Sequence, residues 1–236
     1  MNGIDDIVGQ YAIMTNALYI PPLRYRWLTR LYDPVVRWTT RENTFKQALL
    51  AQLASGQPRR VLDLGCGTGT LAIAISDAMP DTAIAGLDAD DDALSIAADK
   101  GRRASATIDL RQGFSDALPF DDGCFDCVVS SLFFHHLTRE AKIATLREVR
   151  RVLAPDGVLH VADWGKPSNA LMRAVFLMVQ LLDGFETTRD SVTGMLPELM
   201  RTAGFREVVE TAAYATPLGT IRLYRATSAP SRNSNL

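Results

Sequence analysis

The chain is poor in cysteine, in net charge and in long apolar runs, and each shortage excludes a class of protein. Three cysteines among 236 residues are too few for a disulfide scaffold and indicate reduced thiols in a cytoplasm. A formal net charge of −2 argues against a dedicated nucleic-acid binder, which should carry a strong basic excess. The longest apolar stretch, residues 174–182, falls far short of the roughly 20 residues that span a bilayer. The first residues show neither a basic start nor an apolar run, so we expect no signal peptide and a cytoplasmic location.

What the chain does have is the composition of a globular protein, with 47% hydrophobic and 22% charged residues. Residues 1–58 lack strand-like alternation, and prolines at 21, 22 and 34 divide them into short predicted helices. From residue 60 onward, apolar runs alternate with helical patterns, which predicts an α/β fold with a mostly parallel sheet and helices on both faces. The predicted strands are residues 60–64, 83–87, 106–111, 125–130, 158–163, 205–214 and 219–227, the last two as an antiparallel pair. The predicted helices are residues 71–78, 91–103, 139–154, 168–185 and 195–203, with Asp91 or Asp92 near the N-terminal cap of the second.

A glycine-rich turn follows the first predicted strand, with Gly65, Gly67 and Gly69 at alternate positions. Such a turn lets a ligand approach the backbone closely, and the next helix offers free N–H groups to a negative or carboxylate-bearing ligand. The dinucleotide-binding fingerprint has its third glycine three residues after the second, so the spacing here differs. Asp63 suits an ammonium partner, and Asp88 at the end of the second strand can accept both hydroxyls of a ribose. The turn therefore favours a cofactor that carries a ribose and a cation.

Six segments carry recognisable motifs in a fixed order. They are residues 61–71 (the glycine turn), 86–88 (the acidic strand end), 113–126 (LPF…FD), 129–137, 148–157 (E…RVLxPxG) and 203–205 (AGF). Together they resemble the class I S-adenosylmethionine-dependent methyltransferases, in the small-molecule group that includes ubiquinone- and menaquinone-biosynthesis enzymes. The resemblance covers residues 45–227 and implies a Rossmann-like seven-stranded fold, S-adenosylmethionine as cofactor and S-adenosylhomocysteine as product. The implied division is an N-terminal helical arm or lid (1–58), a methyltransferase domain (59–227) with a helical insert over the acceptor site (164–200), and a disordered tail (228–236).

The resemblance also implies roles for single residues around the cofactor. Asp63 and the backbone of the glycine turn would hold the methionine end, Asp88 would bind the ribose, and Ala89 would pack on the adenine. The family often has Asp directly after the glycine of its third-strand segment, to accept from the adenine amino group. Phe114 stands there instead and could stack on the base, while Ser115 or Asp116 would supply the polar contact. The implied cofactor-binding residues are Asp63, Gly65, Cys66, Gly67, Thr68, Gly69, Asp88, Ala89, Phe114, Ser115 and Ser130.

Three residues at strand ends are candidates for the chemistry. Methyl transfer from a sulfonium is an in-line displacement, and a base is needed only if the acceptor must lose a proton. His135 and His136 follow the fourth predicted strand and Asp163 ends the fifth, at the edge where ligands of open α/β sheets bind. All three are candidate catalytic residues, although helix capping, packing or loop anchoring accounts for them equally well. His160, inside the fifth strand, is expected to be structural.

The charge is unevenly divided along the chain, and this division bears on the acceptor. Residues 20–60 carry a net charge of +6, and residues 61–126 carry −9. The acidic part suits a cationic sulfonium. The basic aromatic arm, residues 19–33, predicts an apolar or amphipathic acceptor and transient contact with a lipid surface; residues 170–182 would form an apolar second wall, unless both segments are ordinary core helices. The predicted substrate-binding residues are Tyr19, Tyr25, Trp27, Tyr32 and Met178.

Two other functions stay open. The departure at Phe114 allows a methyltransferase-fold binding protein without turnover, and a nicotinamide-dependent oxidoreductase is disfavoured by the glycine spacing and Asp63. Nucleic-acid methylation is disfavoured because Ser-Ser-Leu-Phe at 130–133 replaces the Asn/Asp-Pro-Pro-aromatic motif. No metal site is predicted, since Cys124-x-x-Cys127 lacks a second Cys or His pair at ligand spacing, and Cys127 is expected in the core. The expected partner is a small-molecule acceptor, and the chain is expected to be a monomer or homodimer.

Overall fold

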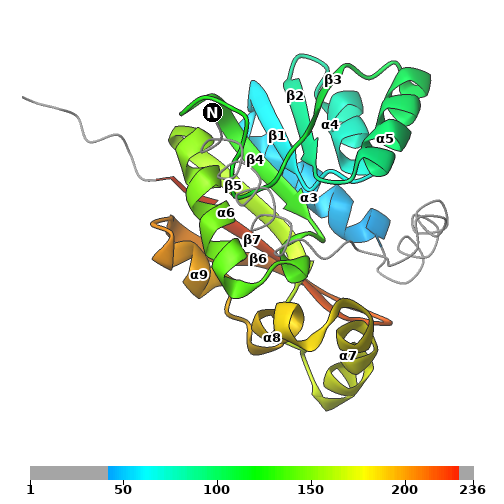
Figure 1. The fold of residues 1–236 in the computed structure, drawn as a ribbon, viewed down its shortest axis with the longest axis vertical. Helices are drawn as coiled ribbons and strands as arrows, with labels where there is room; N and C mark the ends of the chain where they lie inside the picture. Colours follow the sequence, from blue (N-terminus) through cyan, green and yellow to red (C-terminus); the bar gives the residue numbers. More distant parts are fainter. Residues whose placement is uncertain (1–41, 229–236) are drawn as a thin grey trace, which may run out of the picture.

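The computed structural model describes residues 42–228, and their seven strands form one mixed sheet (Figure 1). The strands are β1 (Arg60–Leu64), β2 (Ala83–Asp88), β3 (Ile108–Gln112), β4 (Phe125–Ser131), β5 (Leu153–Trp164), β6 (Arg206–Thr216) and β7 (Gly219–Thr227). They follow the order β3-β2-β1-β4-β5-β7-β6 across the sheet. Strands β1 to β5 pair in parallel, and β7 runs antiparallel to both of its neighbours.

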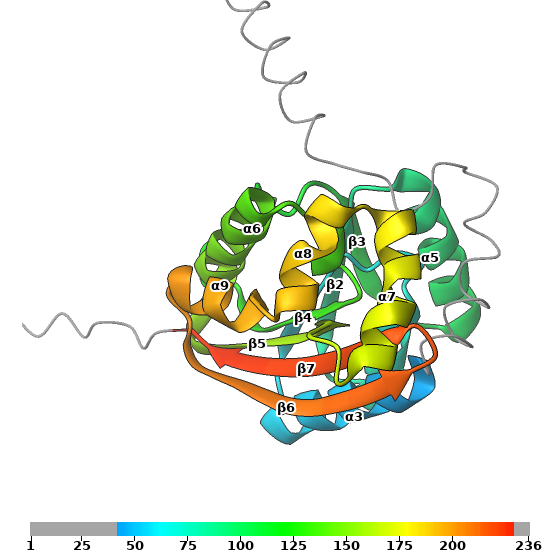
Figure 2. The ribbon, with the colours of Figure 1, turned by 90° about the horizontal axis from the view of Figure 1, so that it is seen from below.

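Helices cover both faces of this sheet and one of its ends (Figures 1 and 2). They are α3 (Glu42–Gly56), α4 (Thr70–Ala78), α5 (Asp91–Ala104), the 3₁₀ helix η2 (Phe134–His136), α6 (Arg139–Val152), α7 (Ala170–Asp183), α8 (Phe185–Thr193) and α9 (Leu196–Thr202). Helix α4 contacts α3 on one side and α5 on the other, while α6 and α9 pack together over the opposite face. Helices α7 and α8 follow the carboxyl end of β5, where α8 also contacts η2.

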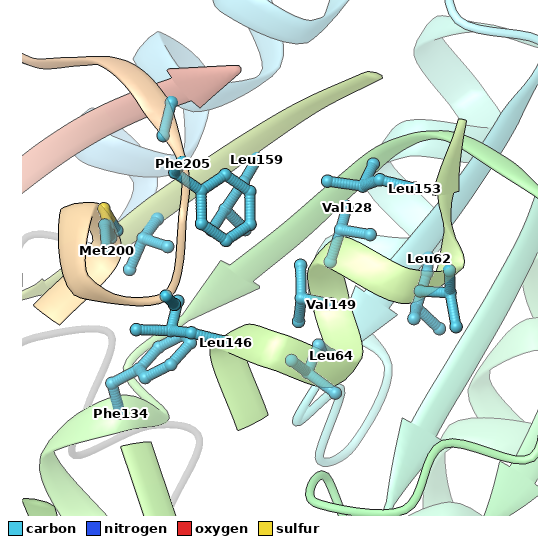
Figure 3. Packing of buried hydrophobic residues seen from close by; sticks show 14 of the residues in the cluster. Leu62, Leu64, Val128, Phe134, Leu146, Val149, Leu153, Leu159, Met200 and Phe205 are labelled. Carbon is cyan, nitrogen blue, oxygen red and sulfur yellow. The ribbon is translucent and has the colours of Figure 1, made fainter. Parts of the chain in front are cut away.

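Two apolar clusters hold the helices to the sheet. Successive side chains of β1 point to opposite faces, so that Leu62 and Leu64 join the cluster under α6 and α9 (Figure 3). Val61 joins the cluster on the other face, together with Phe45 of α3 and Ile75 of α4. Because both faces are covered, four of the five residues of β1 are buried, which explains its almost continuous apolar sequence. This central strand carries the candidate site at its carboxyl end.

The predicted fold class is confirmed, and the main difference lies in β5. This strand begins at Leu153, five residues before its predicted start, and α6 ends at Val152, two residues before its predicted end. The Pro155-Asp-Gly157 sequence was expected to end the helix, but it lies within extended chain. Asp156 takes a φ of 63° there, a conformation that Asp tolerates better than most residues.

The helix predicted over residues 168–185 is α7, and a second helix that was not predicted, α8, follows it directly. Helix α7 ends at Asp183, and Gly184, with a φ of 96°, allows the chain to turn into α8. Helix α8 was missed because its sequence, FETTRDSVT, is polar and carries no apolar stripe.

Side-chain caps set the starts of three helices. Asp90 caps α5 and accepts hydrogen bonds from the backbone N–H groups of residues 92 and 93, and Asp91 and Asp92 follow it in the first turn, near the cap as predicted. Thr138 caps α6 and Asn169 caps α7 in the same way. The cap at Thr138 matters for the site, because it starts α6 and lies only two residues beyond the end of η2.

Several predictions concern residues 1–41 and 229–236, which lie outside the described residues. The division into an arm, a domain with an insert and a tail therefore stays a prediction. Among residues 42–228, no helix is both long and apolar enough to cross a membrane.

Candidate active site

The turn between β1 and α4 contains three glycines in the left-handed backbone conformation and is hydrogen-bonded to the neighbouring strand β2. The φ angles of Gly65, Gly67 and Gly69 are 69°, 51° and 75°, which L side chains rarely adopt. The N–H group of Gly65 donates to the carbonyl of Leu87 in β2 at 2.9 Å. A Cβ at Gly69 would lie 2.8 Å from Cβ of Ala97, whereas one at Gly67 would meet nothing within 4 Å. The turn is thus packed against α5 at Gly69 and open at Gly67.

We expect Gly69→Ala to lower the free energy of unfolding by roughly 1–3 kcal/mol, because the new methyl group meets Ala97 in a strained backbone conformation. Urea unfolding followed by circular dichroism measures the change. Gly56→Ala is the control, since a Cβ at this last residue of α3 meets nothing within 4 Å. Equal losses in the two variants would show that the approach of α5 does not restrict position 69.

Asp88 at the end of β2 is held in one orientation by two backbone donors. Its Oδ2 accepts from the N–H of Gly67 at 2.7 Å, and its Oδ1 accepts from the N–H of Asp90 at 3.0 Å. Burial raises the pKa of Asp88, and these hydrogen bonds oppose the rise. Each carboxylate oxygen keeps a further lone pair, so the group can accept two neighbouring hydroxyls without rotating.

Asp63 is the buried group with the clearest need for a partner. It is 1% exposed, and neither carboxylate oxygen has a hydrogen-bond partner among the described residues. Burial raises the pKa of Asp63 to about 7, an effect that the charge of Lys46 in α3 reduces. A buried carboxylate without donors is costly, and an ammonium group would supply both charge and donors.

Four other predicted cofactor residues are engaged within the protein. The hydroxyl of Ser130 is fully buried and donates to the carbonyl of Leu64 at 2.9 Å, which ties β4 to β1. The hydroxyl of Ser115 pairs with that of Thr145 in α6 at 2.7 Å. Thr68 accepts from the ammonium of Lys100 at 2.8 Å. Cys66 is buried, and burial raises the pKa of its thiol, which keeps it protonated and unreactive.

Phe114 and Ala89 lie at the ends of neighbouring strands. Phe114 follows β3 by two residues and is 40% exposed, which is unusual for a side chain of this size. Ala89 follows Asp88 directly, and its carbonyl accepts from the side chain of Gln112 at 3.3 Å. An aromatic face of this kind can stack on a flat ring such as a nucleobase.

His135 and Asp163 form a buried pair that joins η2 to β5. Nδ1 of His135 lies 2.7 Å from Oδ1 of Asp163, and its backbone N–H donates to Oδ2 at 3.2 Å. The two residues are 3% and 1% exposed. A carboxylate only accepts, so the hydrogen of this bond is assigned to Nδ1 of His135, which leaves Nε2 as the second nitrogen of the ring. The N–H of Trp164 also donates to Oδ1 at 2.6 Å and fixes the carboxylate.

His136 lies directly against this pair. Its ring centroid is 3.9 Å from that of His135, with the planes tilted by 41°. Burial lowers the pKa of His136 well below its ordinary value, and His135 and Lys142 lower it further. His136 is therefore uncharged at neutral pH. The structure thus brings together all three candidate catalytic residues predicted from the strand ends.

The comparisons with known proteins agree with this geometry. Residues 61–157 match a methyltransferase-domain family. Over 167 residues the chain is 32% identical to an uncharacterized methyltransferase of Synechocystis, with 71% of this chain and 76% of the relative covered. The chain belongs to the class I S-adenosylmethionine-dependent methyltransferases.

Two further similarities are to a relative that matches part of the chain and to a solved structure with the same fold. A demethylmenaquinone methyltransferase of Deinococcus radiodurans is 32% identical over 132 residues, which are 56% of this chain and 54% of that relative. The chain thus spans about half the length of this quinone-related relative. The crystal structure of magnesium protoporphyrin IX methyltransferase from Synechocystis, solved with S-adenosylhomocysteine bound, has a TM-score of 0.64 at 17% identity. That likeness covers 80% of this chain and 84% of the other, and it shows the shared fold.

The residues around the methyltransferase turn fit S-adenosylmethionine. The unpartnered oxygens of Asp63 can accept from the ammonium of its methionine part. The open side of Gly67 leaves room for a ligand against the backbone, and Asp88 has lone pairs for the ribose hydroxyls. Phe114 can stack on the adenine.

The predicted acceptor residues of the methyltransferase are the least described. Tyr19, Tyr25, Trp27 and Tyr32 lie outside the described residues, and so does the side chain of Met178 in α7. What α7 and α8 do show is an exposed apolar surface, formed by Leu171, Leu177, Leu181 and Phe185. Helix α7 also contributes the fully buried Phe176 to the core, so both the apolar wall and the ordinary core helix stay open as readings of residues 170–182.

The sequence prediction missed three charged residues around the site, namely Lys46, Lys142 and Asp190. Lys142 lies four and seven residues before Leu146 and Val149, which are both buried, so its helical position was the available signal. Asp190 belongs to the unpredicted helix α8. Lys46 lies one residue after the buried Phe45, and nothing local indicates its proximity to Asp63.

Cys127 and His160 lie toward the other ends of the strands, and the expectation that Cys127 lies in the core is confirmed. Cys127 is buried in the core, where burial raises the pKa of its thiol to about 12. His160 is also buried, and burial together with the charge of Arg225 lowers its pKa to about 4. Both line a cavity of about 410 Å³ at the amino ends of β4 and β5, away from the glycine turn. Among residues 42–228, no group of three or more His, Cys, Asp or Glu side chains is arranged to hold a metal ion.

Proposed function

We propose that this methyltransferase acts on a small aromatic acceptor with a hydroxyl group and an apolar body, and that His135 is the base. The observation that carries the proposal is the buried pair of His135 and Asp163 at the carboxyl ends of β4 and β5. A histidine oriented by a carboxylate is the common arrangement for removing a proton from a hydroxyl.

The residues divide the chemistry between them. When bound, S-adenosylmethionine supplies a methyl group on a sulfonium and leaves as S-adenosylhomocysteine. His135 takes the acceptor's hydroxyl proton at Nε2, and Asp163 stabilises the positive charge that the ring gains. Because His136 stays uncharged, it adds no repulsion to the imidazolium or to the sulfonium. Loss of the proton makes both the acceptor oxygen and the neighbouring ring carbons nucleophilic.

We infer the cofactor contacts from the same geometry. Asp63 accepts from the methionine ammonium, the backbone at Gly67 lies against the methionine, and Asp88 accepts from the ribose. Ala89 and Phe114 border the adenine. The engaged hydroxyls of Ser115 and Ser130 support positioning of the strand ends rather than direct contact with the ligand.

Two observations support an apolar acceptor. The surface of α7 and α8 exposes Leu171 and Leu181, each 67% exposed, and Phe185, 55% exposed. A relative is named for demethylmenaquinone. Contact of the basic aromatic arm with a lipid surface stays a prediction, because residues 19–33 lie outside the described residues.

A labelled-methyl screen tests the proposal. The purified protein is incubated with S-adenosylmethionine labelled in its methyl group and with hydroquinones that carry an apolar chain. Matched acceptors have both hydroxyls already methylated, so that they offer no proton to His135. We expect label in the free hydroquinones alone. Labelling of amines with none of the hydroxyarenes labelled would contradict the proposal.

A further inference from the structure

Lys142 of α6 is a buried lysine that the proposed chemistry leaves without a role. It is 2% exposed. Its Nζ donates to the carbonyl oxygens of Leu137 and Thr187 at 2.8 and 2.7 Å, and lies 3.4 Å from Oδ2 of Asp190. The three hydrogens of the ammonium therefore have one acceptor each. Leu137 follows η2 directly, while Thr187 and Asp190 belong to α8.

Asp190 is bound by cations from two sides. It is 2% exposed, and the guanidinium of Arg139 donates to its Oδ1, with Nε at 3.1 Å. Burial lowers the pKa of Lys142, and the charges of Asp190 and Asp163 oppose that effect. A buried ammonium is tolerated when it is paired and fully hydrogen-bonded, and both conditions hold here.

The arrangement joins three segments of the candidate active site. Helix η2 carries His135 and His136, two residues separate it from the start of α6, and α8 packs against η2. The side chain of Lys142 bonds both to Leu137, at the end of η2, and to Thr187 of α8. Its backbone N–H donates to the carbonyl of Thr138, the cap of α6. Loss of this ammonium would remove a donor from the buried carbonyls of Leu137 and Thr187, and would leave Asp190 with Arg139 as its cation.

We propose that Lys142 is a positioning residue of the methyltransferase: by tying the end of η2 to α8, it fixes the imidazoles of His135 and His136 against β5. The assignment rests on the proposed function, because it gives η2 a part in the chemistry. Lys142 touches neither cofactor nor acceptor in this scheme and acts through the backbone of η2.

The titration of His136 reports whether Lys142 acts on the histidines, and amide exchange reports whether Lys142 holds α8, so the test uses both measurements. The charged and titratable groups that act on it are His135 on η2 and Lys142 on α6. Asp163 on β5 bonds to His135, and Asp190 on α8 pairs with Lys142. The positive charge of Lys142 is among the causes that hold the pKa of His136 low. Removing that charge and loosening η2 would both raise the pKa of His136.

The experiment uses Lys142→Met in the full chain, with the histidine rings followed by NMR during a pH titration. We expect the pKa of His136 to rise, and the amide hydrogens of residues 185–193 to exchange about tenfold faster or more. Exchange in β1 should stay as in the unaltered protein. Arg139→Gln is the matched control, because it removes the half-exposed partner of Asp190 and leaves the ammonium in place. An unchanged titration of His136, or unchanged exchange in α8, would overturn the proposal.

Asp190→Asn keeps the test decisive if Lys142→Met fails to fold. This variant keeps the ammonium and both carbonyl acceptors, and removes only the negative charge. We expect faster exchange in α8 with no rise in the pKa of His136; protection equal to that of the unaltered protein would overturn the proposal. None of these measurements requires an acceptor, so failure of the methyl screen would count against the proposed function alone.

Discussion

Asp63→Asn is expected to weaken binding of S-adenosylmethionine by roughly 30- to 150-fold, equivalent to about 2–3 kcal/mol for a lost charge-assisted contact. The substitution keeps the shape of the side chain but removes the charge that an ammonium requires. Isothermal titration calorimetry at pH 8 measures the loss. Asp77→Asn, an exposed position on α4, is the matched control and should bind as the unaltered protein does. Equal affinities for the Asp63→Asn and Asp77→Asn variants would show that Asp63 does not hold the cofactor.

The pH dependence of the same binding follows from the raised pKa of Asp63. Below about pH 7 the carboxyl is protonated in the free protein, and binding of an ammonium must release that proton. Affinity should therefore rise with pH up to about 7 and then level off, and calorimetry in buffers of different ionisation enthalpy should detect the proton. The Asp63→Asn variant should show neither effect.

The contribution of Asp63 to the stability of the ligand-free protein falls as pH rises, opposite to the trend in cofactor affinity. A carboxyl whose folded pKa is raised stabilises the fold below its unfolded pKa, near 4, and loses that contribution as pH rises through about 7. The ligand-free Asp63→Asn variant should thus be more stable than the unaltered protein at pH 8, while it binds the cofactor more weakly. A variant that was both weaker in binding and less stable would point to a folding defect instead.

Asp163→Asn is expected to lower kcat by about 10²- to 10⁴-fold on any hydroxyarene that the screen identifies. The amide can still face His135, but it no longer fixes the tautomer or stabilises the imidazolium. The affinity for S-adenosylmethionine should change by less than about threefold, because the side chain bonds to His135 and Trp164 rather than to the glycine turn.

Asp156→Asn offers a control on the same strand. Asp156 is exposed at the amino end of β5, and Asn tolerates its left-handed conformation. Its kcat should equal that of the unaltered protein. Equal kcat values for the Asp163→Asn and Asp156→Asn variants would remove His135 and Asp163 from the chemistry and leave them a structural pair.

The sequence was most informative where the signals are local. Gly65, Gly67 and Gly69 predicted a turn because left-handed backbone is a property of the residues themselves. Asp88 and Asp163 were placed at one edge because parallel strands share their carboxyl ends. The bond between His135 and Asp163 could not be predicted, since it depends on the register of β4 against β5.

The residues that were missed depend on contacts between distant segments. Lys142 lies on an amphipathic helix, where a lysine normally faces water, and its carboxylate partner is 48 residues away on α8. The sequence of α8 has no apolar pattern, so the helix that carries Asp190 was not predicted. The two serines predicted to reach the cofactor illustrate the same limit, because only the packed structure shows that Ser115 and Ser130 already have partners.

The position of β7 has a consequence for how the sheet is completed during synthesis. This strand is the last of the seven to leave the ribosome, yet it lies inside the sheet, between β5 and β6. Until it is made, the nascent chain exposes the edge of β5, which carries Leu159 and Val161 and is a template for pairing with another chain. The glycine turn and the segments beside it, β1, β2 and α5, are synthesised early, whereas the edge of β5 is covered only when β7 pairs with it. The segments around the glycine turn are thus synthesised before the strand that covers the edge of β5.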